Sequence, residues 1–261
     1  MLTFYVVPLA SSLVSEFFDQ GYLVLPRTFG EGTVARFRRA FSRLERRARA
    51  LEETTLVQNS LFVVKRTGAT GMRIDRIVWC GGVEPLLGRL GRSPKLVDAA
   101  AELLGAPELD QLVNQAHIKN PGDALEFRFH QDSYHRRYGT DLFTDLDGRG
   151  SFVQTLTAVD AMDPENGGLY VVPESHRLGH IPTLDGRLPE GSFDVSRAVP
   201  VRLAAGDSLL LSPFTVHGSG PNLGTTPRRL FINGFCTAGA NRRVYPGAGT
   251  GYRVRVWEDA A

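Results

Sequence analysis

A histidine and a carboxylate stand two positions apart in the segment EFRFHQD, as His130 and Asp132. The residues before them, Leu125 to Phe129, have the composition of a short β-strand. Alternate side chains of a strand point to the same side, so both groups can reach one point at its end. Two imidazoles and one carboxylate on one face of a metal ion form a facial triad, which leaves coordination positions open. His130 and Asp132 are therefore candidates for two of three metal ligands.

A third candidate ligand, His217, lies near the end of the strand series in the segment FTVHGSGPN. The two glycines and the proline that follow it predict a tight turn. Together the three side chains suit iron(II), which needs free positions for a chelating cosubstrate and for dioxygen. Zinc sites with three protein ligands usually keep a single exchangeable position, which serves hydrolysis.

Two adjacent arginines, Arg228 and Arg229, follow His217 by eleven and twelve positions. A guanidinium binds a carboxylate through two parallel hydrogen bonds, which suits the free carboxylate of a dicarboxylate cosubstrate. A strand is expected to begin here, and neighbouring strand residues point to opposite faces. One arginine must then face inward and the other outward. Each of these features alone is common, whereas the combination in this order is specific.

These motifs together resemble the phytanoyl-CoA dioxygenase family. The resemblance rests on HQD at 130–132, ENGGLYVVPESH at 165–176 and HGSGPN at 217–222, and on the opening FFDQGYLVLP at 17–26. It covers almost the whole chain. It implies an Fe(II)- and 2-oxoglutarate-dependent oxygenase that uses O2, with the catalytic iron bound by His130, Asp132 and His217.

The resemblance also implies the contacts of 2-oxoglutarate. It selects Arg228, the first arginine of the pair, and adds Ser219, two positions after the distal histidine. A polar residue on the strand before the HxD motif often contributes in this family, and Asn114 is the match here. Phe127, three positions before the first ligand histidine, is expected to contact the cosubstrate too.

Four histidines lie outside the motif, and His117, His176 and His180 are expected to be packing or surface residues. His135 follows the metal motif closely, so a contact with substrate stays open for it. The segments 73–79 and 133–139 are expected at the entrance of the site. Their arginines suit an anionic substrate group, or they are ordinary solvated charges.

The reaction expected from the resemblance is the oxidation of an unactivated C–H bond of a small organic molecule. Hydroxylation is the default outcome, and cyclisation, desaturation or epimerisation stay open. Asp132 argues against halogenation, since halogenating relatives replace this carboxylate with a small residue. The 27 arginines against 3 lysines indicate a high-GC bacterial source, which favours tailoring of a secondary metabolite, such as an antibiotic.

Three alternatives stay open: an acyl-CoA or carrier-bound acyl hydroxylase, a zinc-dependent epimerase or hydrolase, and a catalytically inactive jelly-roll binding protein. A net charge of +2 gives no reason to expect nucleic acid as a partner. No run of apolar residues is long enough for a membrane span, and no signal peptide is recognised at the start. A cytoplasmic protein with reduced Cys80 and Cys236 is expected. The sequence does not indicate the oligomeric state.

The elements expected to position these residues are helices first and strands afterwards. Apolar spacing and capping residues predict helices over 12–20, 31–52 and 94–104. A first short strand is expected over 22–25, and eight more after Gly105, over 111–118, 125–129, 152–159, 169–172, 199–203, 208–211, 230–235 and 252–257. We expect a single domain over 1–261 that is mainly β with flanking α-helices. Its N-terminal part, about 1–105, is expected to be helical, and about 106–261 to form a double-stranded β-helix, or jelly roll.

Overall fold

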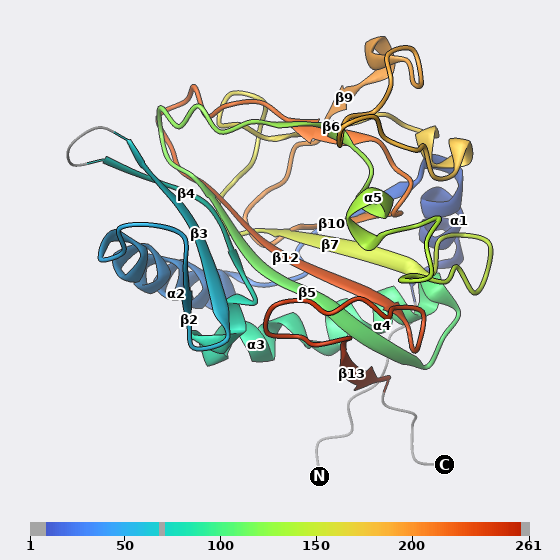
Figure 1. Ribbon diagram of the computed structural model, residues 1–261, viewed down its shortest axis with the longest axis horizontal. Coiled ribbons are helices and arrows are strands. Elements are labelled where there is room, and N and C mark those ends of the chain that lie inside the picture. Colours follow the sequence, from blue (N-terminus) through green and yellow to red (C-terminus); the bar gives the residue numbers. More distant parts are fainter. Residues whose placement is uncertain (1–8, 68–70, 257–261) are drawn as a thin grey trace.

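Two antiparallel sheets face each other, and helices cover the outer side of the larger sheet (Figure 1). The computed structural model describes residues 9–67 and 71–256. Trp257, the expected end of the last strand, and the opening residues 1–8, where no signal peptide was recognised, lie outside this range. No helix in the described ranges has both the length and the apolar character needed to cross a membrane.

The larger sheet has the strand order β1-β10-β7-β12-β5-β4-β3-β2, and β13 also pairs with β5. Its long central strands, β12 and β5, run antiparallel and form one wall of the space between the sheets. The strands are β1 Tyr22–Leu25, β2 Thr55–Val57, β3 Ser60–Thr67, β4 Gly71–Val78, β5 Glu108–Lys119, β7 Phe152–Ala158, β10 Ser208–Leu211, β12 Arg228–Thr237 and β13 Tyr252–Arg255.

The smaller sheet has the order β6-β11-β8-β9 and consists of very short strands. These are β6 Phe127–His130, β8 Leu169–Val171, β9 Val199–Pro200 and β11 His217–Ser219. Two facing antiparallel sheets of this kind form the jelly roll that the strand count predicted. The expected turn after His217 is instead the strand β11, so this histidine is held in a sheet.

The helices are α1 Ser11–Gln20, α2 Glu31–Arg49, α3 Pro85–Gly91, α4 Pro94–Leu104 and α5 Asp132–Arg136, with short 3-10 turns at Cys80–Gly82, Ser175–Leu178 and Val195–Arg197. The predicted apolar face of α2 is confirmed, because Phe37, Phe41 and Leu44 are buried against the larger sheet. The rings of Phe37 and Phe231, on β12, are 5.1 Å apart. α2 and α4 therefore close the outer side of this sheet with a hydrophobic core.

The expectation of a helical N-terminal part is corrected by the strands β2, β3 and β4, which extend the larger sheet. In β3, the buried residues Ser60, Phe62 and Val64 alternate with more exposed neighbours. This is the period of two that defines a half-buried strand. The many Arg, Thr and Gly residues between 52 and 76 obscured the pattern.

Both cysteines are free and buried, as predicted. Burial raises the pKa of the Cys236 thiol to about 12. Burial also raises the pKa of Cys80. Both side chains are thus protonated at neutral pH and serve as small core residues.

Candidate functional site

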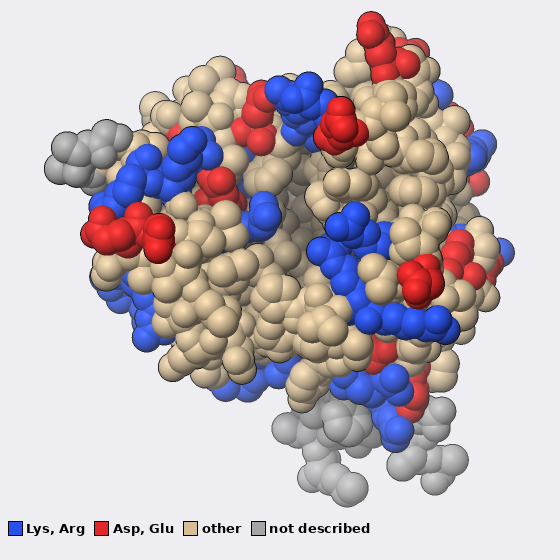
Figure 2. Space-filling view, in the orientation of Figure 1, with Lys and Arg blue, Asp and Glu red and all other residues tan. Residues whose placement is uncertain are grey.

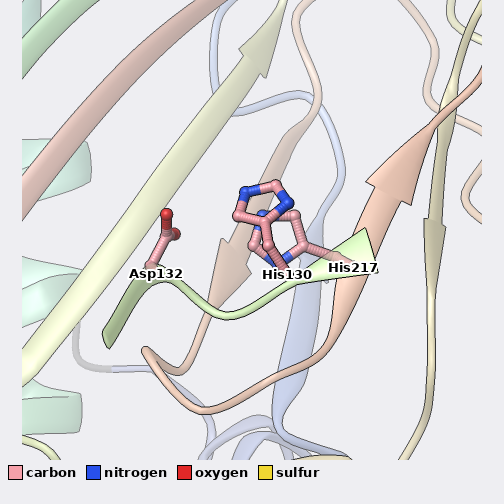
Figure 3. Close-up of side chains that lie close together, drawn as sticks. All are labelled: His130, Asp132 and His217. Atoms are coloured by element: carbon pink, nitrogen blue, oxygen red, sulfur yellow. The ribbon is translucent and has the colours of Figure 1, made fainter. Parts of the chain in front are cut away.

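His130, Asp132 and His217 come together at one end of the smaller sheet (Figure 3). His130 is the last residue of β6, and its cross-strand partner in β11 is His217. Asp132 follows as the first residue of α5, so the chain leaves the strand and turns its carboxylate toward the two imidazoles. Ligand atoms of the three side chains all lie within 4.8 Å of one another. One metal ion can bridge that spacing.

Backbone carbonyls orient both imidazoles. Nδ1 of His130 donates to the carbonyl oxygen of Arg128 at 2.7 Å, and Nδ1 of His217 donates to that of Thr215 at 2.9 Å. These bonds fix the tautomer and leave Nε2 of each ring as the free ligand atom. Burial, followed by the charge of His217, lowers the pKa of His130 to about 3. The imidazole is therefore neutral, the form that binds a metal.

The carboxylate of Asp132 completes the set. Its side chain is buried, and its Oδ2 has no hydrogen-bond partner among the described residues. A buried carboxylate oxygen without a partner is costly in free energy, and a bound cation removes that cost. The donor set of two imidazoles and one such carboxylate therefore fits a divalent transition metal.

A glycine allows the two ligand strands to approach each other. A Cβ atom at Gly218 would lie 2.9 Å from the carbonyl oxygen of Phe127 and 3.0 Å from the nitrogen of Phe129. Real side chains do not tolerate such contacts with backbone atoms. Gly218 thus permits the close pairing of β11 with β6 that places His217 beside His130.

A cavity of about 380 Å³ lies between the two sheets and contains the three side chains in its wall. Figure 2 shows the corresponding hollow in the middle of this face, with basic side chains on two sides of it. The apolar part of the wall comes from both sheets, and consists of Val78, Val113, Leu156, Leu169, Leu230 and Ile232. This wall limits contact with bulk water.

Arg228 lies in the same cavity, and Arg229 points to the opposite face of β12. Arg229 binds the carboxylate of Asp160 at 2.6 Å and 2.9 Å, beside α2. The expectation of one inward and one outward arginine is confirmed. Arg228 is 1% exposed, and its Nε donates to the carbonyl oxygen of Gly167 at 3.2 Å. Burial lowers the pKa of Arg228 to about 9, so its guanidinium stays charged near neutral pH.

Lys119 is a functional candidate that sequence analysis missed. It is the cross-strand partner of Arg228 and is fully buried, so two cations share one side of the sheet. Its Nζ donates to Ser219 Oγ at 2.8 Å and to the carbonyl oxygen of Gly220. Burial and the charge of Arg228 lower the pKa of Lys119 to about 6. No carboxylate in the described ranges forms an ion pair with either residue, which is the arrangement expected of an anion-binding site.

Of the three other residues that the resemblance implied as cosubstrate contacts, two lie in the cavity wall and one does not. Phe127 and Ser219 line the cavity, and Lys119 lies over the ring of Phe127, 5.4 Å from its centre. Asn114 faces the other side of β5, where it binds the backbone of Gly81 and the side chain of Asn233, both at 2.8 Å. The prediction for Asn114 was wrong. Its neighbour Gln115 faces the cavity, because strand residues alternate.

The remaining histidines have separate roles. His176 binds the carbonyl oxygen of Phe18 in α1, and His180 binds Ser133 Oγ, so both are structural, as expected. His117 packs in the cavity wall with its Nε2 on Gln115. His135 also lines the cavity, with its ring 5.5 Å from that of His130. The expected position of His135 near a substrate is thus available to it.

The model of the family described as "Phytanoyl-CoA dioxygenase (PhyH)" matches residues 17–230. A methylphosphonate hydroxylase of Gimesia maris is 31% identical over 137 residues, which cover 52% of this chain and 48% of that protein. The chain thus matches about half the length of this relative. Among solved structures, apo EctD from S. alaskensis is 22% identical with a TM-score of 0.72, covering 94% of this chain and 82% of its own. The epimerase SnoN, solved with Fe3+, alpha-ketoglutarate and nogalamycin RO, is 22% identical with a TM-score of 0.67, covering 87% and 83%.

Proposed function

Since the chain belongs to the phytanoyl-CoA dioxygenase family, we propose that it is an iron(II)- and 2-oxoglutarate-dependent oxygenase that oxidises a C–H bond of a small organic substrate. The observation that carries the proposal is the cluster of His130, Asp132 and His217, whose ligand atoms lie within 4.8 Å of one another. The two free Nε2 atoms and the unpartnered Asp132 oxygen are the proposed iron ligands. Three protein ligands leave the rest of the metal's coordination sphere to small molecules.

The proposed site for the distal carboxylate of 2-oxoglutarate is the pair formed by Lys119 and Arg228, which both contact the carbonyl oxygen of Gly167. Arg228 has the planar donor arrangement that a carboxylate prefers, and Lys119 is a second basic group beside it. Ser219 positions Lys119 and supplies a hydroxyl, and Phe127 covers the methylene chain. The proposal keeps Arg228, Ser219 and Phe127 from the sequence analysis and replaces Asn114 with Lys119.

The bound iron and 2-oxoglutarate supply the oxidising chemistry, in which 2-oxoglutarate, O2 and R–H become succinate, CO2 and R–OH. The chain's own residues orient these partners and exclude water. The apolar wall built by Leu156, Leu230 and Ile232 keeps the reacting carbon away from solvent. The carboxylate of Asp132 fills the ligand position that a halide would need, so hydroxylation is the default outcome of the proposal.

The cavity also bears on the class of substrate. Its volume of about 380 Å³ lies near the lower end of the range of roughly 300–1,000 Å³ for small-molecule sites. This size favours a small metabolite over a long acyl-CoA chain. A methylphosphonate hydroxylase and an epimerase bound to nogalamycin RO are among the similar proteins, so relatives act on varied small molecules. These observations support our proposal that the protein tailors a small molecule of bacterial secondary metabolism.

Asp132→Ala and His217→Ala test the proposal. Each removes one of three ligands, so we expect iron-dependent formation of succinate from 2-oxoglutarate to fall below detection. Asp141→Ala is the matched control, because Asp141 is exposed and lies outside the cavity wall. Without oxygen, the wild-type protein with iron(II) and 2-oxoglutarate should show a weak visible metal-to-ligand absorption band. Full turnover in either ligand variant, or zinc as the only metal bound, would rule the proposal out.

A further inference from the structure

The cavity wall carries far more positive than negative charge. Besides Arg228, three arginines line it, namely Arg76, Arg136 and Arg243. Asp132, a proposed metal ligand, is the one carboxylate among the described lining residues. None of the three arginines forms an ion pair with an acidic residue in the ranges 9–67 and 71–256. Arg73, on the same strand as Arg76, is by contrast bound to Asp75 at 2.6 Å.

Arg136 is the most buried of the three arginines, and two of its hydrogen-bond donors have no acceptor among the described residues. It is 6% exposed, and its Nε and Nη1 have no hydrogen-bond partner in the described part of the chain. Its guanidinium lies between the rings of Phe152 and Tyr245, 5.3 Å and 4.8 Å from their centres. Aromatic rings stabilise the cation but accept no strong hydrogen bond. Buried donors without acceptors are rare in proteins and point to a ligand that supplies them.

Arg243 lies beside Arg136 on the same tyrosine. Its guanidinium is 5.0 Å from the centre of the Tyr245 ring, and its Nη1 donates to the carbonyl oxygen of His135 at 2.7 Å. The Tyr245 hydroxyl lies 3.3 Å from the same carbonyl oxygen. These contacts hold the loop after β12 against α5. They keep the two guanidinium groups in the wall of the cavity that also contains His130, Asp132 and His217.

Arg76 adds a third cation from β4, on the larger sheet. It is half-buried and lines the same cavity. His135 lines the same cavity as Arg76 and Arg136. Three elements, β4, α5 and the loop after β12, thus each bring one arginine to the wall of the cavity.

We propose that the substrate carries a phosphonate or phosphate monoester group, which Arg76, Arg136 and Arg243 bind while the metal cluster faces a nearby C–H bond. A carboxylate needs one planar guanidinium for its two oxygens, and Arg228 already provides that elsewhere. A tetrahedral group with three terminal oxygens and between about one and two negative charges at neutral pH matches three guanidinium groups from separate elements. This assignment rests on the proposed oxygenase function, because it names the substrate class of the same site.

Calorimetric titration tests the assignment, with the protein loaded with iron(II) and 2-oxoglutarate under nitrogen. The probes are propylphosphonate, propyl phosphate, propanesulfonate, butyrate and propanol. We expect the two phosphorus compounds to bind at least about tenfold more tightly than butyrate or propanesulfonate, and propanol not to bind. The pair of phosphorus compounds then separates a phosphonate site from a phosphate ester site. Equal binding of butyrate, or of propanol, would overturn the assignment.

Single substitutions locate the anion. Arg243→Gln and Arg76→Gln should each weaken binding of the preferred phosphorus compound by about tenfold or more. Arg242→Gln is the matched control, since Arg242 is exposed and lies outside the cavity wall. Arg136 is buried, so Arg136→Lys, which keeps the charge, tests its hydrogen-bond geometry while the melting temperature reports on folding. Unchanged binding in both Arg243→Gln and Arg76→Gln contradicts the proposal.

The absorption band of iron(II) with 2-oxoglutarate distinguishes a failure of the phosphorus assignment from a failure of the oxygenase proposal. If the band forms and all probes bind alike, the phosphorus assignment fails and the oxygenase proposal stands. If the band does not form in the wild-type protein, the oxygenase proposal fails and this assignment falls with it.

Discussion

Lys119 and Arg228 place two buried basic side chains on adjacent strands without an acidic partner in the described chain. Such a pair is unfavourable in the free protein, because burial and mutual repulsion both penalise the charged forms. The penalty falls on lysine, since the guanidinium holds its proton more strongly. The pKa of Lys119 is accordingly lowered to about 6, with Arg228 as the second cause after burial, and Glu126 and Asp123 as weaker opposing charges.

This arrangement predicts that binding of 2-oxoglutarate takes up a proton. Lys119 is mostly neutral in the free protein above about pH 6. A carboxylate arriving beside it favours the charged form and raises its pKa. The affinity for 2-oxoglutarate should therefore fall as the pH rises above about 6, by at most about tenfold per pH unit. Calorimetry at pH 7.5 in two buffers of different ionisation enthalpy measures the uptake, which we expect to approach one proton.

Lys119→Met should abolish this proton uptake and make the affinity nearly independent of pH between 6.5 and 8.5. Lys95→Met is the control, because Lys95 binds the backbone of Thr28, far along the chain from this pair. The measurement uses metal-loaded protein, so that the histidine ligands have already lost their protons. Undiminished uptake in Lys119→Met would show that another group takes the proton.

The short strands β6 and β11 are the elements that build the metal cluster, and their pairing depends on one glycine. Because a Cβ atom at Gly218 would meet backbone atoms of β6, Gly218→Ala must push the two strands apart. Supporting changes of this kind typically weaken metal binding by about 10- to 100-fold. We expect such a loss in a titration with manganese(II), with the far-ultraviolet circular dichroism retained.

Gly220→Ala provides the comparison for this element. Gly220 lies two positions further along, and nothing lies within 4 Å of the position of its Cβ. Metal affinity should stay within about twofold of the wild type. Equal effects of the two substitutions would mean that the close approach of β11 to β6 is not what positions His217.

At the same scale, sequence analysis predicted elements with strong patterns and missed those that depend on their neighbours. The apolar spacing of α2 and the strand β10 at 208–211 were predicted correctly. The strands β2, β3 and β4 were missed, and β12 was predicted too short. These strands extend the sheet in turn, since β4 pairs with β5, β3 with β4 and β2 with β3, and a local pattern does not contain this pairing.

The difference between local patterns and tertiary contacts also explains which site residues were predicted from the sequence. The three proposed metal ligands lie in two local motifs, so residue type and spacing sufficed to predict that they come together. Asn114 was assigned to the wrong face because a shift of one residue reverses the direction of a strand side chain. Lys119 was missed because its role follows from the register of β12 with β5. Arg136 lies in the segment 133–139 that was expected at the entrance, whereas its packing on Tyr245 was not predicted. Tertiary contacts of this kind are not encoded in spacing.

At the scale of the whole molecule, the proposed ligands join parts of the chain that are far apart. The metal cluster links β6, α5 and β11, and the pair formed by Lys119 and Arg228 links β5 to β12. A hydrophobic core between the sheets, which includes Leu156, Leu209 and Leu230, holds these parts in place. Ligands that bind only this folded arrangement must stabilise it by mass action.

Manganese(II) and 2-oxoglutarate together should therefore raise the melting temperature. A ligand present at about 100 times its Kd contributes roughly 2.7 kcal/mol, which corresponds to a shift of about 5–10 °C for a domain of this size. Differential scanning fluorimetry measures the shift, with metal alone and 2-oxoglutarate alone as references. In Asp132→Ala, neither manganese(II) nor 2-oxoglutarate should raise the melting temperature, since 2-oxoglutarate needs the metal as its second anchor. In Arg228→Gln, manganese(II) should still raise it, and added 2-oxoglutarate should raise it no further. A 2-oxoglutarate shift that survives in Arg228→Gln would place the cosubstrate elsewhere in the molecule.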